Sequence, residues 1–569
     1  MTAHWGEVQI RNEPVLDRAR AFAAGLPRPR WGIADRYLAD VAAISILLAI
    51  AAFYTAAVVV PIESFIRGDW PSFFFPNYAL LGERLRDFDI PGWNPAQFSG
   101  TPFVGEPSSG WGYLLAMLLY VLFAPETATV VFIGAHIALA AVATYVLARL
   151  LGLSVAGGIV AGGAYSLAWV AVASSYMVLW FGVTIWMMVS LVATELAARA
   201  SSWPRRLWAW LLGGIGISQV IAAWLGQGSY YALLVIVAWI AFRTLVIPIR
   251  ATSARARVQH ALLTGAGVLG SGVCVVRRRL ASPLRCYRPL KSGGGVYLGS
   301  SAWADRQIGF TPTELVREVL GGYPGSQWWY AGAAATALAL MAPIVARRWP
   351  PLIFFTLVAL GSLVLALAQM TPLHTALNVA LPFFERLHKH SRERILLLYS
   401  PAVALLAGAC VTYLPKRGTS PLLLPAAAAI PLVVAAFFGV APDFAGLLSP
   451  DSFAFLIATS TLTVLYALLP MSLPRAGVLL ALVVLVLWDP GGRILLRGFV
   501  DESRLAVSLR GSLTRDAGTF LHDNGAANYL VGATQSSPGR YAGYDPTHLD
   551  DPQTIDIIPP DVGYRNALA

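Results

Sequence analysis

Charged residues are scarce in this sequence. Asp, Glu, Lys and Arg together account for 12% of the 569 residues, whereas hydrophobic residues account for 57%. Because a soluble domain carries about 25% charged residues, this composition excludes a water-soluble protein. Apolar runs of about 18 to 25 residues recur along most of the chain, and each is long enough to cross the hydrocarbon core of a bilayer as a helix. The sequence therefore predicts an all-α, polytopic membrane protein.

Cysteine is also scarce, which excludes two further classes of protein. Cys274, Cys286 and Cys410 are too few and too widely spaced for a disulfide framework or a zinc site. The net charge of +11 does not indicate a nucleic-acid partner, because the basic residues lie mainly in short segments between the apolar runs, where they determine topology. A cleavable signal peptide is not expected, because the polar residues 1–37 precede the first apolar run.

Thirteen apolar segments are predicted membrane spans. They cover residues 38–61, 127–148, 155–178, 180–198, 207–225, 229–246, 259–276, 330–346, 352–369, 394–414, 421–441, 451–470 and 476–489. A further segment, GWGYLLAMLLYVLFA at 110–124, is intermediate in length between a short span and a re-entrant or interfacial helix.

The positions of Lys and Arg decide between these alternatives, since basic residues collect in cytoplasmic loops. If 110–124 does not cross, the cytoplasmic side holds nearly every basic cluster: Arg149; Arg199, Arg205 and Arg206; Arg243, Arg250, Arg255 and Arg257; Arg347 and Arg348; Lys416 and Arg417; and Arg475. If it crosses, most of these clusters lie outside. We therefore predict a cytoplasmic tail over 1–37, a membrane domain of 13 spans over 38–489, a re-entrant or juxtamembrane 110–124, and an external C-terminus.

This topology leaves three external regions long enough to hold chemistry, at 62–126, 277–329 and 371–393. In the first outer loop, YALLGERLRDFDI has the charge pattern of an amphipathic helix at the membrane interface. Asp69 lies just beyond the first span, and a carboxylate near hydrocarbon is costly unless it is paired or used. An arbitrary loop aspartate is nevertheless more often a solvated residue than a functional one.

Several stretches resemble a known family. They are RLRDFDIPGWNPAQFSGTPFVGEPSSGWGYLL, LARLLGLSVAGGIVAGGAYSLAW, WLGQGSYYALL, GGYPGSQWWYAG and HSRERILLLYSPAVALLAG. Together they are similar to the YfhO-like bacterial membrane proteins of the GT-C glycosyltransferase superfamily, over most of residues 60–415. The WNP and FSGTPF portion is fairly specific, whereas the apolar portions are not.

The resemblance implies a GT-C-like bundle in the bacterial inner membrane that takes a sugar from a polyprenyl-phosphate donor on the outer face and transfers it to a cell-envelope acceptor. In that superfamily a carboxylate at the start of the first outer loop activates the acceptor, and Asp69 occupies the matching position. An inverting transfer needs such a base, together with cations that stabilise the departing phosphate.

A basic cluster at the outer end of the predicted span 394–414 is the candidate phosphate site. It consists of His388, Lys389, His390, Arg392 and Arg394. Arginine suits bidentate phosphate contact, and the resemblance makes Arg394 and Arg392 the strongest candidates. The alternative is a cationic collar that contacts lipid headgroups.

Further residues are candidates for lining the site: Glu106, Gln227, Asp305, Arg306 and Tyr323. The segment GQGSYY at 226–231 is expected to form a tight external turn. Glu314 is expected to close a helix cap, and His136 to be a satisfied core histidine. No metal site is predicted, although Asp69 and Glu106 could share a divalent cation.

Two segments do not fit the general pattern. Residues 274–291 carry six basic residues directly after a predicted outward span, which we interpret as a local frameshift or sequence error, or alternatively as a second lipid-phosphate patch. The tail 490–569 reads as the start of a small external mixed α/β module that ends early.

Three functions are compatible with these features. The leading hypothesis is a GT-C-type glycosyltransferase. The first alternative is a transporter or flippase of lipid-linked saccharides, against which the spans show few buried charges. The second is an inactive member of the family.

Overall fold

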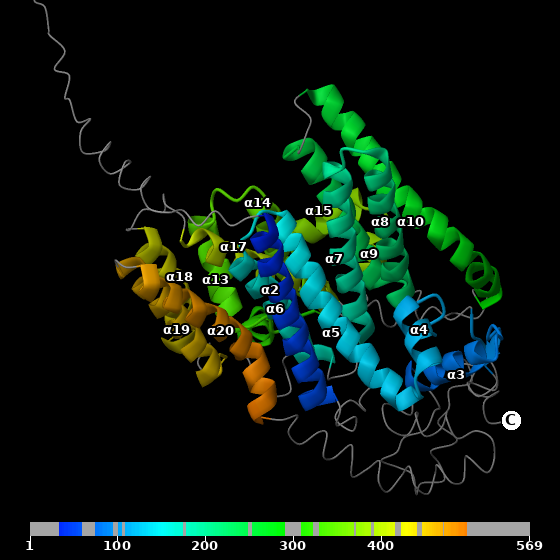
Figure 1. Ribbon diagram of the computed structural model, residues 1–569, viewed down its shortest axis with the longest axis horizontal. Helices are drawn as coiled ribbons and strands as arrows, with labels where there is room; N and C mark the ends of the chain where they lie inside the picture. Colours follow the sequence, from blue (N-terminus) through cyan, green and yellow to red (C-terminus); the bar gives the residue numbers. More distant parts are fainter. Residues whose placement is uncertain are drawn as a thin grey trace, which may run out of the picture.

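The computed structural model describes thirteen stretches of the chain. They are residues 33–59, 74–94, 101–104, 109–173, 178–248, 253–290, 309–321, 329–368, 371–388, 392–415, 423–440, 447–469 and 472–497. These stretches are almost entirely helical, and the long helices pack side by side as a bundle (Figure 1). Asp69, Glu106, Asp305, Arg306, Tyr323 and Lys389 lie outside the described residues, as does the predicted tail from residue 498 onward.

Each predicted span overlaps a helix of this bundle. The helices are α2 (Ile33–Tyr54), α5 (Pro125–Leu150), α6 (Val155–Ala173), α7 (Val178–Arg199), α8 (Trp203–Ala223), α9 (Gln227–Ala241), α10 (Ala254–Leu290), α13 (Ala333–Val345), α14 (Leu352–Leu365), α17 (Tyr399–Tyr413), α18 (Leu423–Val440), α19 (Pro450–Leu468) and α20 (Ser472–Arg497). Within the described residues, 8 helices are long and apolar enough to cross a membrane. The protein is therefore an all-α membrane protein.

Two helices are longer than the spans predicted for them. Helix α10 begins at Ala254 and continues to Leu290, whereas the predicted span is 259–276. Helix α20 continues through Pro490 to Arg497, beyond the predicted boundary at 489. Hydropathy identifies only the part of a helix that suits hydrocarbon. Because arginine is a good helix former, α10 and α20 continue beyond the ends of their apolar stretches.

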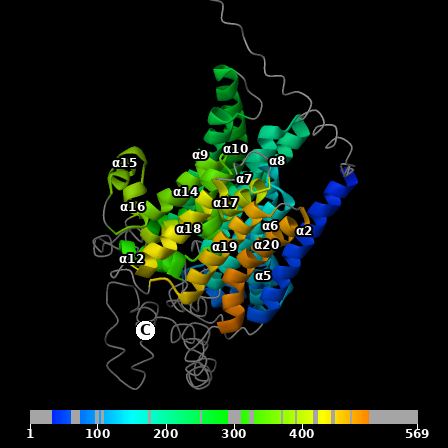
Figure 2. The same ribbon diagram turned by 90° about the vertical axis from the view of Figure 1, so that its left-hand side faces the viewer.

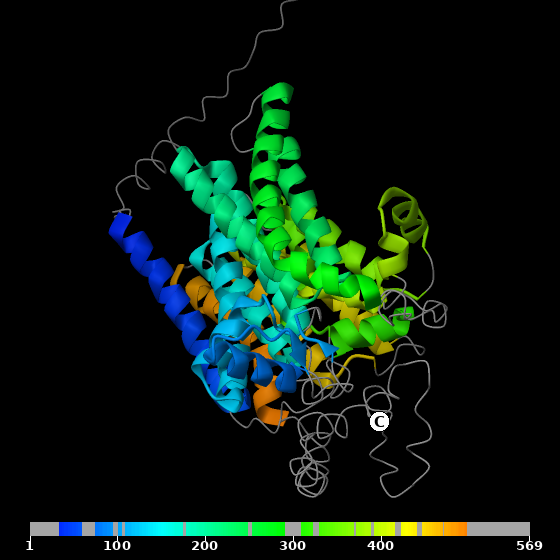
Figure 3. The ribbon, with the colours of Figure 1, turned by 90° about the vertical axis from the view of Figure 1, so that its right-hand side faces the viewer.

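Shorter elements connect the long helices. They are η1 (Thr55–Val59), α3 (Phe75–Arg86), β1 (Trp93–Asn94), β2 (Thr101–Pro102), α4 (Leu114–Leu122), η4 (Phe242–Val246), α12 (Pro312–Val316), η7 (Arg317–Gly321), α15 (Pro372–Ala380), α16 (Phe384–His388) and η8 (Arg392–Leu398). Strands β1 and β2 pair antiparallel. Helices α15 and α16 lie at the edge of the bundle, beside α14 and α9 (Figure 2), and α10 packs along α8 on another edge (Figure 3).

Helix α4 is too short to cross a bilayer. Its 9 residues span about 14 Å at the helical rise, roughly half of the hydrocarbon thickness. The Arg86 guanidinium at the end of α3 donates hydrogen bonds to the Tyr120 and Val121 carbonyls at the end of α4, at 3.0 and 3.2 Å. Gly82 lies so close to the Tyr120 carbonyl that an added Cβ would be 2.2 Å from its oxygen. We call residues 74–94, 101–104 and 109–123 the α3–α4 unit.

Contacts between helix ends define one end of the bundle. The Arg149 side chain at the end of α5 pairs with Asp40 near the start of α2, at 2.7 Å. Trp349, after α13, donates to the Leu151 carbonyl at 3.1 Å, and Arg199, at the end of α7, donates to the Leu150 carbonyl at 2.8 Å. Because most of the predicted cytoplasmic arginines lie at these helix ends, we call this the basic end.

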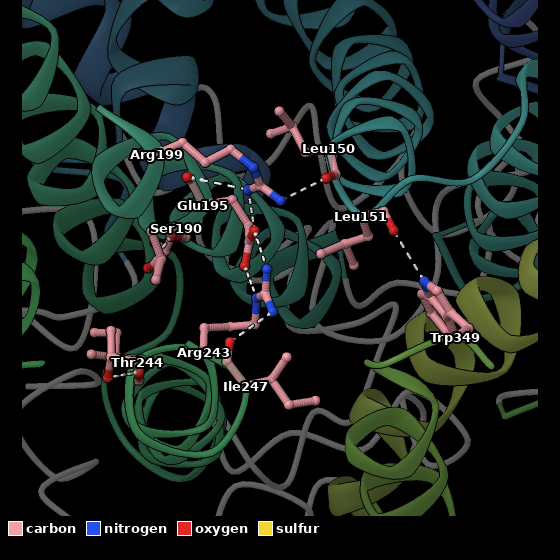
Figure 4. Close-up of polar contacts among 11 residues, drawn as sticks. Leu150, Leu151, Ser190, Glu195, Arg199, Arg243, Thr244, Ile247 and Trp349 are labelled. Atoms are coloured by element: carbon pink, nitrogen blue, oxygen red, sulfur yellow. Dashed lines mark hydrogen bonds and ion pairs between the residues drawn. The ribbon is translucent and has the colours of Figure 1, made fainter. Parts of the chain in front are cut away.

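A buried acid ties α7 to η4, which directly follows α9, at the basic end (Figure 4). Glu195 is completely buried, and its carboxylate accepts hydrogen bonds from Arg243 at 2.6 and 3.2 Å and from Arg199. A buried carboxylate is stable only when paired in this way. Arg243 thus lies inside the bundle, whereas the sequence suggested only a topology signal.

Small residues let α6 lie at the centre of the bundle. Gly157 of α6 and Gly408 of α17 face each other, and a Cβ added to either would lie 2.4 Å from the other's carbonyl oxygen. On neighbouring faces, Gly162 approaches the Ala141 carbonyl of α5 and Gly163 approaches Leu487 of α20. Close backbone approach through small residues is how helices associate in membranes.

Candidate functional site

The end of the bundle opposite the basic end holds the described members of the predicted site: Gln227, His388, Arg392 and Arg394. Long helices that follow one another in the sequence run in opposite directions. This end therefore also holds the α3–α4 unit, the α8–α9 turn and the start of α17. The neighbours of each residue decide what chemistry it can perform.

Arg394 lies over a pair of stacked indoles. Its guanidinium carbon is 4.9 Å from the ring centre of Trp180, near the start of α7, and 5.4 Å from that of Trp224, just after α8. The two indoles stack at 5.5 Å, and Trp329, before α13, lies parallel to Trp180 at 5.9 Å. We call Arg394, Trp180, Trp224 and Trp329 the Arg394 site. Cation–π contact of this kind is worth about 0.5–2 kcal/mol and stabilises the guanidinium in this position.

The α8–α9 turn positions Trp224. Gly226 has φ +142, a conformation that favours glycine, and the turn closes when Ser229 Oγ accepts a hydrogen bond from the Gly226 amide at 3.0 Å. The prediction of a tight turn over 226–231 is therefore wrong in its extent, because the turn lies at 225–226 and residues 227–231 form the start of α9. Tyr230 donates to the Pro382 carbonyl at 2.8 Å and so ties the turn to the α15–α16 hairpin.

Gln227 and His388 belong to a buried hydrogen-bonded relay. Gln227 Nε2 donates to the Tyr231 hydroxyl at 2.9 Å, and that hydroxyl lies 2.7 Å from His388 Nδ1. Burial lowers the pKa of His388 to about 3, with His374 and Arg392 adding to the effect. His388 is therefore a neutral imidazole at physiological pH, so the positive charge needed to bind a phosphate must come from other residues.

Arg392 is also buried, and its guanidinium donates to the Ala368 carbonyl. His374, whose ring centre lies 5.1 Å from that of His388, accepts from the Thr371 amide and helps to cap α15. The structure thus divides the predicted basic cluster in two. Arg394 lies on the tryptophans, whereas His388 joins α16 to α9 and Arg392 joins η8 to the chain after α14.

The α3–α4 unit is anchored on α5, α7 and α8. Tyr113, which precedes α4, donates to His136 Nε2 of α5 at 2.5 Å and accepts from Trp186 Nε1 of α7 at 3.1 Å. His136 Nδ1 bonds the Phe132 carbonyl at 2.6 Å, which confirms that His136 is a satisfied core histidine. Gln219 of α8 accepts from the Leu114 amide at 2.7 Å.

Glu314 has the structural role that its sequence context indicates. It forms a capping box with Thr311 at the start of α12, and the hydrogen bonds from Thr311 lower the pKa of its carboxyl group. Among the residues that the structure describes, no group of three or more His, Cys, Asp or Glu side chains is placed to hold a metal ion.

Sequence reasoning missed two parts of this end of the bundle. The tryptophans of the Arg394 site lie near span ends, where an indole is ordinarily an interfacial anchor, so their convergence carries no local signal. Asp489 of α20 is completely buried and accepts hydrogen bonds from Tyr330 and from the start of α13. The sequence does give one signal for Asp489, since an acidic residue at the end of an apolar run is unusual.

No protein-family model matches the chain, and no curated protein matches it. The function is therefore argued from the geometry at this end of the bundle. That geometry offers a guanidinium on an aromatic platform, at the same end of the bundle as the anchored α3–α4 unit. Such an arrangement suits an anionic group.

Proposed function

We propose that the protein is a membrane glycosyltransferase of the GT-C type, which uses a polyprenyl-phosphate-linked sugar on the outer face of the bacterial inner membrane to glycosylate a cell-envelope acceptor. Arg394 binds the donor phosphate, and Asp69 is the base that activates the acceptor hydroxyl. The role of Asp69 rests on the resemblance of its sequence surroundings to that superfamily.

One observation supports the proposal most: α7 and α8 each contact both the α3–α4 unit and the Arg394 site. On α7, Trp186 bonds Tyr113 and Trp180 lies under Arg394. The two tryptophans are six positions apart, or about 9 Å along the helix. On α8, Gln219 bonds the start of α4, and Trp224 follows at the end of the helix. The described part of the first outer loop is thus anchored on the same two helices that carry the tryptophans of the Arg394 site.

The chemistry requires a base and a cation. A sugar phosphate already has a good leaving group, so the enzyme has to position the acceptor, remove its proton and stabilise the departing phosphate. A guanidinium can donate two parallel N–H bonds to one phosphate, which makes arginine a suitable residue for the donor phosphate.

The proposed orientation follows from the basic end. Lys and Arg collect in cytoplasmic loops, so the basic end faces the cytoplasm and the Arg394 site faces outward. With 13 spans and a cytoplasmic N-terminus, the C-terminus is also outside. Polyprenyl-linked sugars presented on the outer leaflet would then meet Arg394 at headgroup depth.

The test is sugar transfer by the full-length protein in proteoliposomes. The probes are undecaprenyl phosphates that carry radiolabelled hexoses, with an envelope extract as acceptor. Asp69→Asn should abolish transfer with expression intact. Arg394→Ala should lower kcat/KM by about 100-fold, and Arg394→Lys, which keeps the charge but not the planar fork, by about tenfold. The control Arg347→Ala removes an exposed arginine at the basic end and should leave transfer unchanged.

Two outcomes would contradict the proposal. Full activity of Asp69→Asn would remove Asp69 from the mechanism. Movement of the lipid-linked sugar across the bilayer by a protein that transfers none of it would instead identify a transporter.

A further inference from the structure

Asp489 is a fully buried acidic residue to which the proposed reaction gives no role. One carboxylate oxygen accepts a hydrogen bond from the Tyr330 hydroxyl at 2.6 Å, and the other accepts one from the Ala334 amide at 2.7 Å. An ionisable side chain at membrane depth is costly and is rarely present without a partner or a function. Both oxygens act as acceptors here, which is the role of a carboxylate rather than of an amide.

The carboxylate caps a helix that cannot cap itself. Helix α13 begins at Ala333, and the residue before it is Gly332, with a φ of +96 that favours glycine. Because glycine has no side chain, Gly332 cannot accept a hydrogen bond from the first amides of the helix. Asp489, 155 residues away in sequence, supplies the missing acceptor from α20. A negative charge at this position also interacts favourably with the positive end of the helix dipole.

The capped segment leads directly to the Arg394 site. The Tyr330 hydroxyl accepts from the Ala333 amide at 2.9 Å while it donates to Asp489. Trp329, the residue before Tyr330, is 2% exposed and lies parallel to Trp180, with 7° between the ring planes. Trp180 in turn supports Arg394. A continuous series of contacts therefore runs from Asp489 to Arg394.

We propose that Asp489 is a positioning residue for Arg394. Its carboxylate fixes the turn before α13, which holds Trp329 against Trp180 and so keeps the platform under the guanidinium in place. The inference rests on the proposed function only for the statement that Arg394 then binds a lipid phosphate. Asp489→Asn is the direct variant, because an amide of the same shape must turn its NH2 group toward one of the two donors.

The first experiment needs no ligand. The full-length protein in detergent is treated with phenylglyoxal, which modifies arginine, and the rate of modification of Arg394 is measured by peptide mass spectrometry. Asp489→Asn should raise this rate by about tenfold, the scale expected for loss of a cap. The matched control is Ser449→Ala, since Ser449 is a buried cap that accepts from the Ser452 amide at the start of α19. This variant should leave the rate unchanged.

The second experiment measures the Kd of undecaprenyl phosphate for the same proteins. Asp489→Asn should weaken binding by about tenfold in the wild-type background and have no further effect in an Arg394→Ala background, because coupled residues are not additive. Tyr330→Phe removes the hydroxyl that bonds both Asp489 and the Ala333 amide, and it should weaken binding in the same direction. This variant tests the inference if Asp489→Asn does not fold.

The outcomes separate this inference from the proposed function. Equal labelling of Arg394 in wild type and Asp489→Asn would overturn the inference. It would also be overturned if Asp489→Asn weakened binding by the same factor in the Arg394→Ala background as in wild type. Increased labelling together with identical Kd values for wild type and Arg394→Ala would support the positioning role and contradict the phosphate role of Arg394.

Discussion

Arg392 and Arg394 are two residues apart, yet their side chains have different environments. Both lie in η8, where residues two apart point in different directions. Arg392 is buried against the Ala368 carbonyl, and Arg394 lies over Trp180 and Trp224. In a sequence they form one basic cluster, but in the structure a single guanidinium of this pair lies on the aromatic platform.

His388 gives a prediction for the dependence of stability on pH. The ordinary pKa of histidine is about 6.5, and burial lowers that of His388 to about 3. Between these values the unfolded chain binds a proton that the folded chain does not, so the free energy of unfolding is highest above the ordinary pKa and falls as the pH is lowered. The unfolding temperature in detergent should therefore decrease from pH 7.5 to pH 5.

His388→Gln is the variant that tests this assignment. Glutamine keeps a polar group near Tyr231 and does not titrate. The variant should be less stable than wild type at pH 7.5 but lose less stability between pH 7.5 and pH 5. Parallel pH curves for the two proteins would show that His388 is not responsible for the loss.

At the scale of elements, backbone contact between helices constrains α6 most. Gly157 meets Gly408 with no space for a methyl group, and a Cβ at Gly157 would also lie 2.1 Å from Thr412 Oγ1. The sequence AGGIVAGGA contains the small residues, but it does not say which helix each glycine faces. The structure assigns Gly157 to α17, Gly162 to α5 and Gly163 to α20.

Gly157→Ala should lower the free energy of unfolding by about 1–3 kcal/mol, because the added methyl group forces two backbones apart. The matched control is Gly361→Ala on α14, where an added Cβ has no heavy atom within 4 Å. That variant should be neutral or more stable by up to about 1 kcal/mol, the difference in helix propensity. Thermal unfolding in detergent compares the two, and equal effects would mean that α6 and α17 are not in backbone contact.

At the scale of the whole molecule, orientation can be tested with single cysteines. In a variant without Cys274, Cys286 and Cys410, Glu83→Cys on α3 should react with an impermeant maleimide in intact cells. Arg206→Cys at the basic end should react only after permeabilisation, because positively charged ends stay in the cytoplasm. The opposite pattern would put the Arg394 site inside the cell and exclude an outer-face donor.

The sequence by itself determined the membrane class, the positions of the long helices, the short α4 and the basic end. These properties depend on length, apolar content and local charge, all of which can be read along the chain. It also indicated local caps such as Thr311 and Glu314, because their partners are three residues apart.

Only the tertiary structure decided which side chains meet. The tryptophans under Arg394 come from α7, from the end of α8 and from the segment before α13, and Asp489 caps a helix 155 residues away. Hydropathy fixes the depth of each helix in the membrane but not its neighbours or its rotation, which follow from side-chain packing between helices. For that reason the sequence identified Arg394 as a candidate but could not separate it from Arg392.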